Sequence, residues 1–185
     1  MVDQKGAQLA PHPDSDQGKV GGIYVAAYRG SGDKLWLLYR VEVNPRVLRL
    51  PQVDEPQRAD GLWETTCFEA FLRLPDSDAY FELNFAPSTK WAAYRFSGYR
   101  QNRTDLEIDT PFVSMDSRAG LYLFEADLKL PSAWARFPIR LGMSAIVETL
   151  DGNKSYWALA HTNPEKPDFH HPDCFALELP APDEA

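Results

Sequence analysis

The chain has 185 residues, of which 44% are hydrophobic and 25% are charged, and its formal net charge is -8. This length fits one domain with short tails, and the composition is that of an ordinary globular protein. The acidic balance argues against general nucleic-acid binding, which needs clustered Lys and Arg, and against docking on anionic membranes.

The two ends of the sequence differ in composition from the middle. Residues 1–19 are polar and lack the apolar stretch of a secretory signal, so we expect a cytoplasmic protein unless a signal was removed before this numbering begins. No apolar run approaches the roughly 20 residues of a membrane helix. We expect a disordered N-terminal tail (1–19), a single β-sandwich domain (20–179) and a C-terminal tail (180–185).

Short strand-like runs follow one another through this domain. Many are rich in aromatic or β-branched residues and are bounded by turn formers. The runs are 23–28, 35–43, 47–50, 66–74, 79–86, 90–96, 112–115, 121–130, 139–149, 155–160 and 174–179. Asp151-Gly152-Asn153 is the clearest hairpin turn, and residues 132–136 are expected to form one helical turn. About ten short strands at regular spacing predict an all-β fold, a two-sheet antiparallel β-sandwich or a barrel.

The stretch from Trp63 to Arg100 is the most informative, because it interleaves polar groups with large rings. Side chains alternate along a strand, so the two faces of each run can be assigned by parity. If these strands are neighbours, Glu69, Glu82, Asn84 and Arg95 gather on one polar face. Such a face suits a carbohydrate, whose hydroxyls donate and accept together and whose C–H faces lie on aromatic rings.

The candidate ligand-binding residues combine these polar groups with nearby rings and with two histidines of a later loop. They are Trp63, Glu69, Glu82, Asn84, Trp91, Tyr94, Arg95, Tyr99, Arg100, Trp157, His161 and His170. A purely structural interpretation stays open beside this one, because Glu69 or Glu82 can pair with Arg95 or Arg73 across strands.

The loop 161–173 holds three of the four histidines. His161, Asp168, His170 and His171 are ligand types that bind metals, but adjacent residues of an extended chain point different ways and prolines interrupt the segment. A rigid loop whose side chains bond backbone groups is the first interpretation, ligand contact the second and a metal site the third. Two cysteines, Cys67 and Cys174, are expected to be buried free thiols, and a disulfide requires their strands to be neighbours.

Four segments of the chain resemble the motifs of bacterial DOMON-like domains. They are Trp63–Glu69 (WETTCFE), Asn84–Ser88 (NFAPS), Trp91–Arg100 (WAAYRFSGYR) and Lys166–His171 (KPDFHH). The resemblance extends from about residue 20 to residue 179. The wider DOMON group is similar to family-nine carbohydrate-binding modules.

The resemblance implies an immunoglobulin-like or jelly-roll β-sandwich with a ligand pocket on one sheet. It also implies that the region of Trp63 and Glu69 shapes this pocket and that the strands with Glu82, Asn84 and Arg95 continue it. Relatives bind sugars or haem, and those that bind haem use Met and His as axial ligands.

Three functions follow from these observations. The first is a non-catalytic module that binds a small saccharide or a sugar-containing metabolite. The second is a binder of haem or another redox cofactor, for which Met115, Met143 and His161 are available. The third is a glycan-active hydrolase that uses Glu69 and Glu82 as its two carboxylates. The sequence names no cofactor and sets no oligomeric state.

Overall fold

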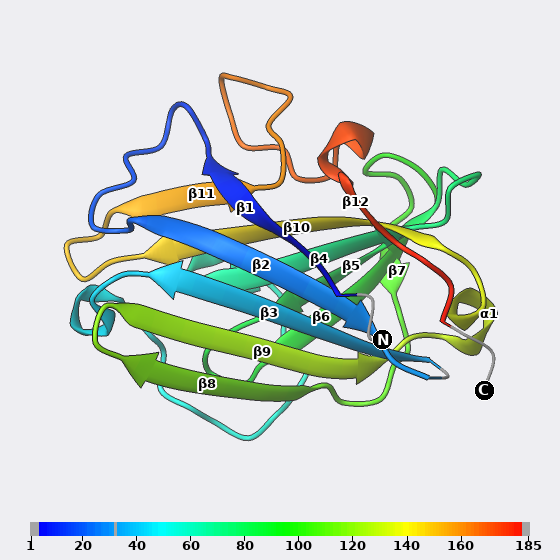
Figure 1. Ribbon diagram of the computed structural model, residues 1–185, viewed down its shortest axis with the longest axis horizontal. Helices are drawn as coiled ribbons and strands as arrows, with labels where there is room; N and C mark the ends of the chain where they lie inside the picture. The colour runs from blue at the N-terminus through cyan, green and yellow to red at the C-terminus, as the bar shows by residue number, and fades with distance from the viewer. Residues whose placement is uncertain (1–3, 32, 183–185) are drawn as a thin grey trace.

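The structure is a computed structural model that describes residues 4–31 and 33–182 (Figure 1). Within these residues it contains twelve β-strands, one α-helix of a single turn (α1, Ser132–Ala135) and three short 3₁₀ turns. The predicted all-β class and the helical turn at residues 132–136 are confirmed. None of the described helices has the length and apolar character needed to cross a membrane.

The strands form a curled antiparallel sheet with two halves. One half contains β2 (Gly22–Arg29), β3 (Lys34–Glu42), β8 (Phe112–Arg118) and β9 (Leu121–Lys129), in the order β2-β3-β9-β8. The other contains β4 (Cys67–Arg73), β5 (Tyr80–Phe85), β6 (Trp91–Phe96), β7 (Thr104–Asp105), β10 (Ile139–Glu148), β11 (Lys154–Ala158) and β12 (Leu177–Leu179). Its order is β7-β6-β5-β4-β10-β11, and β12 pairs with β10.

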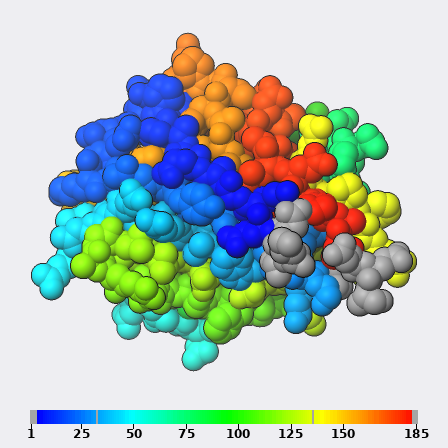
Figure 2. Space-filling view, in the orientation of Figure 1, coloured from blue at the N-terminus to red at the C-terminus, as the bar shows by residue number. Residues whose placement is uncertain are grey.

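Strand β1 (Lys5–Pro11) joins the two halves. Its first five residues pair with β2, and its last two pair with β11. Figure 2 shows this N-terminal segment lying along one face of the molecule beside the C-terminal segment. The expected disordered tail at residues 1–19 is therefore wrong for residues 5–11. Residues 1–3 and 183–185 of the two expected tails lie outside the described residues.

The main core lies between the two halves of the sheet. Tyr39 of β3 and Phe124 of β9 pack against Phe68 of β4, with ring centroids 5.0 Å and 4.3 Å apart. Strands β3 and β9 bury mainly alternate residues, as expected for strands with one face on the core. Every residue of β5, and all but the last residue of β4, is buried. The outer face of these two strands is therefore covered as well.

Two expected strands differ from the structure. Residues 47–50 follow a 3₁₀ turn (Pro45–Val47) and contribute one isolated bridge, because Asn44 caps the turn and Pro45 starts it. The run 174–179 begins in another 3₁₀ turn (Pro172–Cys174), and only its end forms β12. Cys67 and Cys174 are both buried free thiols, as expected.

Candidate ligand-binding site

The covered outer face of β4 and β5 carries the polar side chains that the sequence places there. Glu69 of β4 lies directly opposite Asn84 of β5, and Glu82 lies two residues from Asn84 on the same face. On the other side of β4, Ser144 of β10 lies opposite Glu69. The prediction that Glu69, Glu82 and Asn84 share one face is confirmed.

A pocket of about 420 Å³ opens on this face. Its lining residues with carboxyl, guanidinium or imidazole groups are Glu69, Glu82, Arg100, Arg103 and His170. Its other lining residues are Trp63, Phe71, Phe96, Ile146, Tyr156, Pro167 and Phe169. The pocket thus combines donors, acceptors and aromatic rings in a space large enough for a small ligand.

Three loop segments, residues 61–64, 97–103 and 167–170, build the walls of the pocket above the strands. Trp63 belongs to a 3₁₀ turn (Leu62–Glu64) that follows Gly61 (φ 73°) and packs edge-on against Tyr94 at 6.4 Å. Arg100 and Arg103 come from the hairpin after β6, in which Arg100 and Asn102 adopt left-handed φ angles of 54° and 49°. Residues other than glycine that adopt left-handed φ angles carry backbone strain, which is often found at functional sites.

Glu69 lies on the pocket floor with 3% of its surface exposed. Ser144 Oγ donates a hydrogen bond of 2.8 Å to its Oε2. Burial raises the pKa of Glu69 to about 8, and the nearby Glu82 adds to the increase. Glu69 is therefore mostly a neutral carboxylic acid at pH 7, so it can both donate and accept a hydrogen bond.

Glu82 has a more polar environment than Glu69. Asn84 Nδ2 donates to its Oε1 at 2.8 Å, and His170 Nε2 lies 3.8 Å from its Oε2. Burial raises the pKa of Glu82, while Asn84, Arg103 and Arg100 oppose the increase. Within the described residues, the buried Asn84 Oδ1 has no hydrogen-bond partner.

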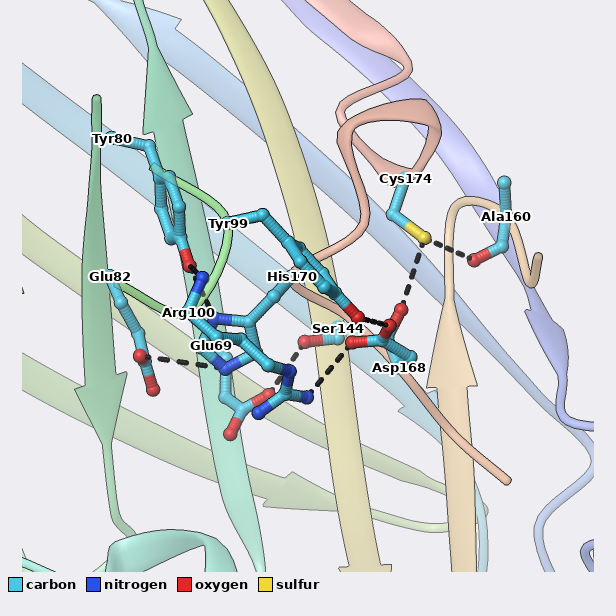
Figure 3. Close-up of polar contacts among 10 residues, drawn as sticks. All are labelled: Glu69, Tyr80, Glu82, Tyr99, Arg100, Ser144, Ala160, Asp168, His170 and Cys174. Atoms are coloured by element: carbon cyan, nitrogen blue, oxygen red, sulfur yellow. Dashed lines mark hydrogen bonds and ion pairs between the residues drawn. The ribbon is translucent and has the colours of Figure 1, made fainter. Parts of the chain in front are cut away.

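His170 is held in one orientation by Tyr80 (Figure 3). The Arg100 backbone N–H donates to the Tyr80 oxygen at 3.2 Å, which leaves the Tyr80 hydroxyl proton free to bond His170 Nδ1 at 2.8 Å. Burial, followed by the charge of Arg100, lowers the pKa of His170 to about 4. The imidazole is therefore neutral at pH 7, and its proton lies on Nε2, facing Glu82.

Asp168 fixes the rim of the pocket. Its two carboxylate oxygens accept hydrogen bonds from the Tyr99 hydroxyl and from Arg100 Nη2, the latter at 2.8 Å (Figure 3). Burial opposes ionisation of Asp168, but the bonds from Tyr99 and Arg100 outweigh it and lower its pKa. Asp168 is therefore an anion that holds the Arg100 guanidinium beside the pocket.

Eight of the twelve candidate residues lie in or beside the pocket. Five of them line the pocket: Trp63, Glu69, Glu82, Arg100 and His170. Three more lie next to it. Asn84 supports Glu82, Tyr94 packs behind Trp63, and Tyr99 holds Asp168.

The other four candidates lie away from the pocket, so the prediction that they join it is wrong. Trp91 and Trp157 belong to the main core, opposite Phe85 and Ala145. Arg95 lies opposite Phe81, on the face away from Glu82, and is exposed. His161 packs its ring on His12 and bonds the Ala10 carbonyl at 2.8 Å.

Several lining residues were not among the candidates. Phe71 and Phe96 have the same parity as Glu69 and Tyr94, so the strand period could have identified them. Arg103 lies in the hairpin connection after β6, which has no clear sequence signature. Tyr156 lies beside the more conspicuous Trp157, which points the opposite way. Among residues 4–31 and 33–182, no three His, Cys, Asp or Glu side chains gather as metal ligands.

Comparison with known proteins adds evidence on the fold. No protein-family model matches the sequence, and no curated protein matches it either. A proposed carbohydrate-binding protein from Bacteroides uniformis has a similar structure, with a TM-score of 0.64 and 13% identity. The similarity covers 91% of this chain and 83% of the other. At this identity it shows a shared fold alone.

Two structures of a family-nine carbohydrate-binding module from Caldicellulosiruptor kristjanssonii are more weakly similar. The complex with glucose has a TM-score of 0.47 and 12% identity, and covers 84% of this chain and 74% of the module. The complex with cellotriose has a TM-score of 0.43 and 13% identity, and covers 75% and 66%. Similarities of this size carry no argument about the site.

Proposed function

We propose that this protein is a non-catalytic module that binds a carbohydrate or a sugar-containing metabolite in the pocket on β4 and β5. The observation that carries the proposal is the convergence of Glu69, Glu82 and Arg100 beside the ring of Trp63. The similarly folded protein from Bacteroides uniformis, for which carbohydrate binding is itself a proposal, is in keeping with it. We also propose that the curled sheet is a two-sheet sandwich of the DOMON-like, jelly-roll type.

The hydrogen-bonding groups of the pocket match the chemistry of a sugar. Neutral Glu69 offers a donor and an acceptor, Glu82 offers acceptors, and Arg100 and Arg103 offer donors. Trp63 is 36% exposed, so part of its ring is open to the C–H face of a sugar. A ligand with both hydroxyls and apolar C–H faces satisfies these groups together.

A glycan-active hydrolase is the second candidate, because Glu69 has the raised pKa that a general acid needs. Against it, Glu69 and Glu82 project from adjacent strands of the same floor. They therefore approach a ligand from one side, whereas a glycosidase holds its two carboxyl groups on either side of the scissile bond. A binding role fits this placement better than a hydrolytic role.

A haem-binding role lacks support at the residues expected for it. Met143 is buried in the main core, and Met115 packs against the same core from β8. His161 bonds the Ala10 carbonyl and does not line the pocket. The histidine that does line it, His170, has its Nε2 3.8 Å from Glu82 Oε2.

Titration calorimetry against a panel of neutral and acidic monosaccharides and oligosaccharides tests the proposal. We expect at least one sugar to bind, and Trp63→Ala to weaken it about tenfold through loss of the stacking surface. Phe112→Ala, at an exposed ring on β8, is the matched control and should leave affinity unchanged. Failure of every sugar to bind would contradict the proposal. Release of reducing ends that stops in Glu69→Gln would instead establish the hydrolase.

A further inference from the structure

A second hollow, of about 450 Å³, lies beside the pocket and shares a wall with it. Its lining includes Tyr99, Thr162, Glu165, Asp168 and His171. These residues supply hydroxyl, carboxylate and imidazole groups and one exposed phenol ring. The second hollow therefore has the same kinds of groups as the pocket, although none of its residues lines the pocket.

Two short segments form the wall between the pocket and the second hollow. In each segment, some residues line the pocket and their neighbours line the second hollow. Arg100 lines the pocket, whereas its neighbour Tyr99 lines the second hollow. In the loop 167–171, Phe169 and His170 line the pocket, whereas Asp168 and His171 line the second hollow. The hydrogen bonds that Asp168 accepts from Tyr99 and Arg100 tie the two segments into a single divider (Figure 3).

The top of this divider is accessible. The Arg100 side chain is 50% exposed and Tyr99 is 46% exposed, whereas Asp168 is buried beneath them. A chain that leaves the pocket can therefore cross the Arg100 side chain and reach the Tyr99 ring. Exposed phenol rings provide flat surfaces for the C–H face of a sugar.

The loop that forms the far side of the second hollow is held in place from several directions. His12 Nε2 donates to the Asn163 carbonyl at 2.8 Å, and His161 Nε2 donates to the Ala10 carbonyl at 2.8 Å. The thiol of Cys174 contacts the Ala160 carbonyl at 3.2 Å. Because these contacts already hold the loop in place, little conformational entropy of the protein is lost when a ligand binds, as expected of a preformed subsite.

We propose that the second hollow is a subsite for a further unit of the same sugar chain, so that the ligand is an oligosaccharide that crosses the Arg100–Asp168 pair. This inference rests on the proposed function and names its ligand class more closely. The first sugar occupies the pocket, and the next lies against Tyr99 with its hydroxyls toward Thr162 and Glu165.

Calorimetry with the full chain tests the subsite by varying ligand length. The probes are glucose, galactose, mannose and xylose, each compared with its β-1,4-linked disaccharide and trisaccharide. In the series that binds, we expect the trisaccharide to bind about tenfold more tightly than the monosaccharide, as one stacked ring and one or two hydrogen bonds would give.

Three variants locate the gain in affinity. Glu165→Ala should lower the affinity for the trisaccharide about threefold to tenfold and leave the affinity for the monosaccharide unchanged. The reason is that Glu165 lines the second hollow and does not line the pocket. Tyr99→Ala should remove the advantage of the trisaccharide over the monosaccharide. Glu55→Ala, at another exposed glutamate, should leave both affinities unchanged.

Equal affinities for the monosaccharide and the trisaccharide would overturn the subsite while leaving the proposed function intact. The same loss for both ligands in Glu165→Ala would also overturn it. If no sugar in any series binds, the proposed function fails and the subsite fails with it.

Discussion

Replacing Glu69 with Gln should change how the stability of the protein depends on pH. Burial raises the folded-state pKa of Glu69 from 4.5 to about 8, so the folded protein binds this proton more tightly than the unfolded chain does. The resulting stabilisation is fully present below about pH 4.5 and is lost as the pH rises toward 8. At about 1.4 kcal/mol per pKa unit, the loss amounts to about 5 kcal/mol. Glu69→Gln keeps a neutral side chain and does not undergo this loss.

Urea denaturation between pH 4 and pH 9, followed by tryptophan fluorescence, measures the effect. The free energy of unfolding of Glu69→Gln minus that of the wild type should rise by about 1.4 kcal/mol per pH unit through the middle of this range, and level off above pH 8. Glu55→Gln, which removes an exposed carboxylate, provides the baseline. Parallel stability curves for the wild type and Glu69→Gln would refute the neutral buried acid.

Three further changes test the placement of individual side chains. Arg103→Gln should weaken sugar binding in calorimetry while Arg95→Gln leaves it unchanged, because Arg103 lines the pocket and Arg95 does not. A loss of binding in Arg95→Gln alone would show that the faces of β6 are misassigned. Tyr39→Phe removes the 2.6 Å bond from the buried hydroxyl to the Glu69 carbonyl, so it should lower the free energy of unfolding by about 1–2 kcal/mol in urea, and no loss would contradict this bond. Deleting residues 1–11 removes β1 and the buried Leu9 and should cost more than about 2 kcal/mol, whereas an unchanged urea midpoint would show that the segment is a loose tail.

The sequence was most informative where the physics is local. Alternation along a strand depends on one segment alone, so the shared face of Glu82 and Asn84, and the opposite parity of Tyr94 and Arg95, could be predicted. Which of the two β6 faces meets Glu82 depends on the register with β5. That register pairs Glu82 with Tyr94 and sends Arg95 to the other side. If the wrong face of a strand is assigned to the pocket, every side chain of that strand is placed on the wrong side of the sheet. The error at Arg95 is of this kind.

Tryptophans illustrate a second limit of the sequence. Trp63, Trp91 and Trp157 are the same residue in similarly aromatic surroundings, yet one lines the pocket and two fill the main core. Only long-range packing separates these roles, since rings serve a core and a sugar site equally well. Strand β1 was missed for a related reason. Leu9 is its one fully buried residue, so pairing with β2 and β11, rather than an apolar pattern, holds it in place.

A crystal structure of the protein with a bound oligosaccharide tests the central claim most directly. The account predicts a sugar ring on the Trp63 indole, with its hydroxyls within hydrogen-bond distance of Glu69 and Glu82. A sugar bound on another face of the molecule, with no density beside these three side chains, would contradict it.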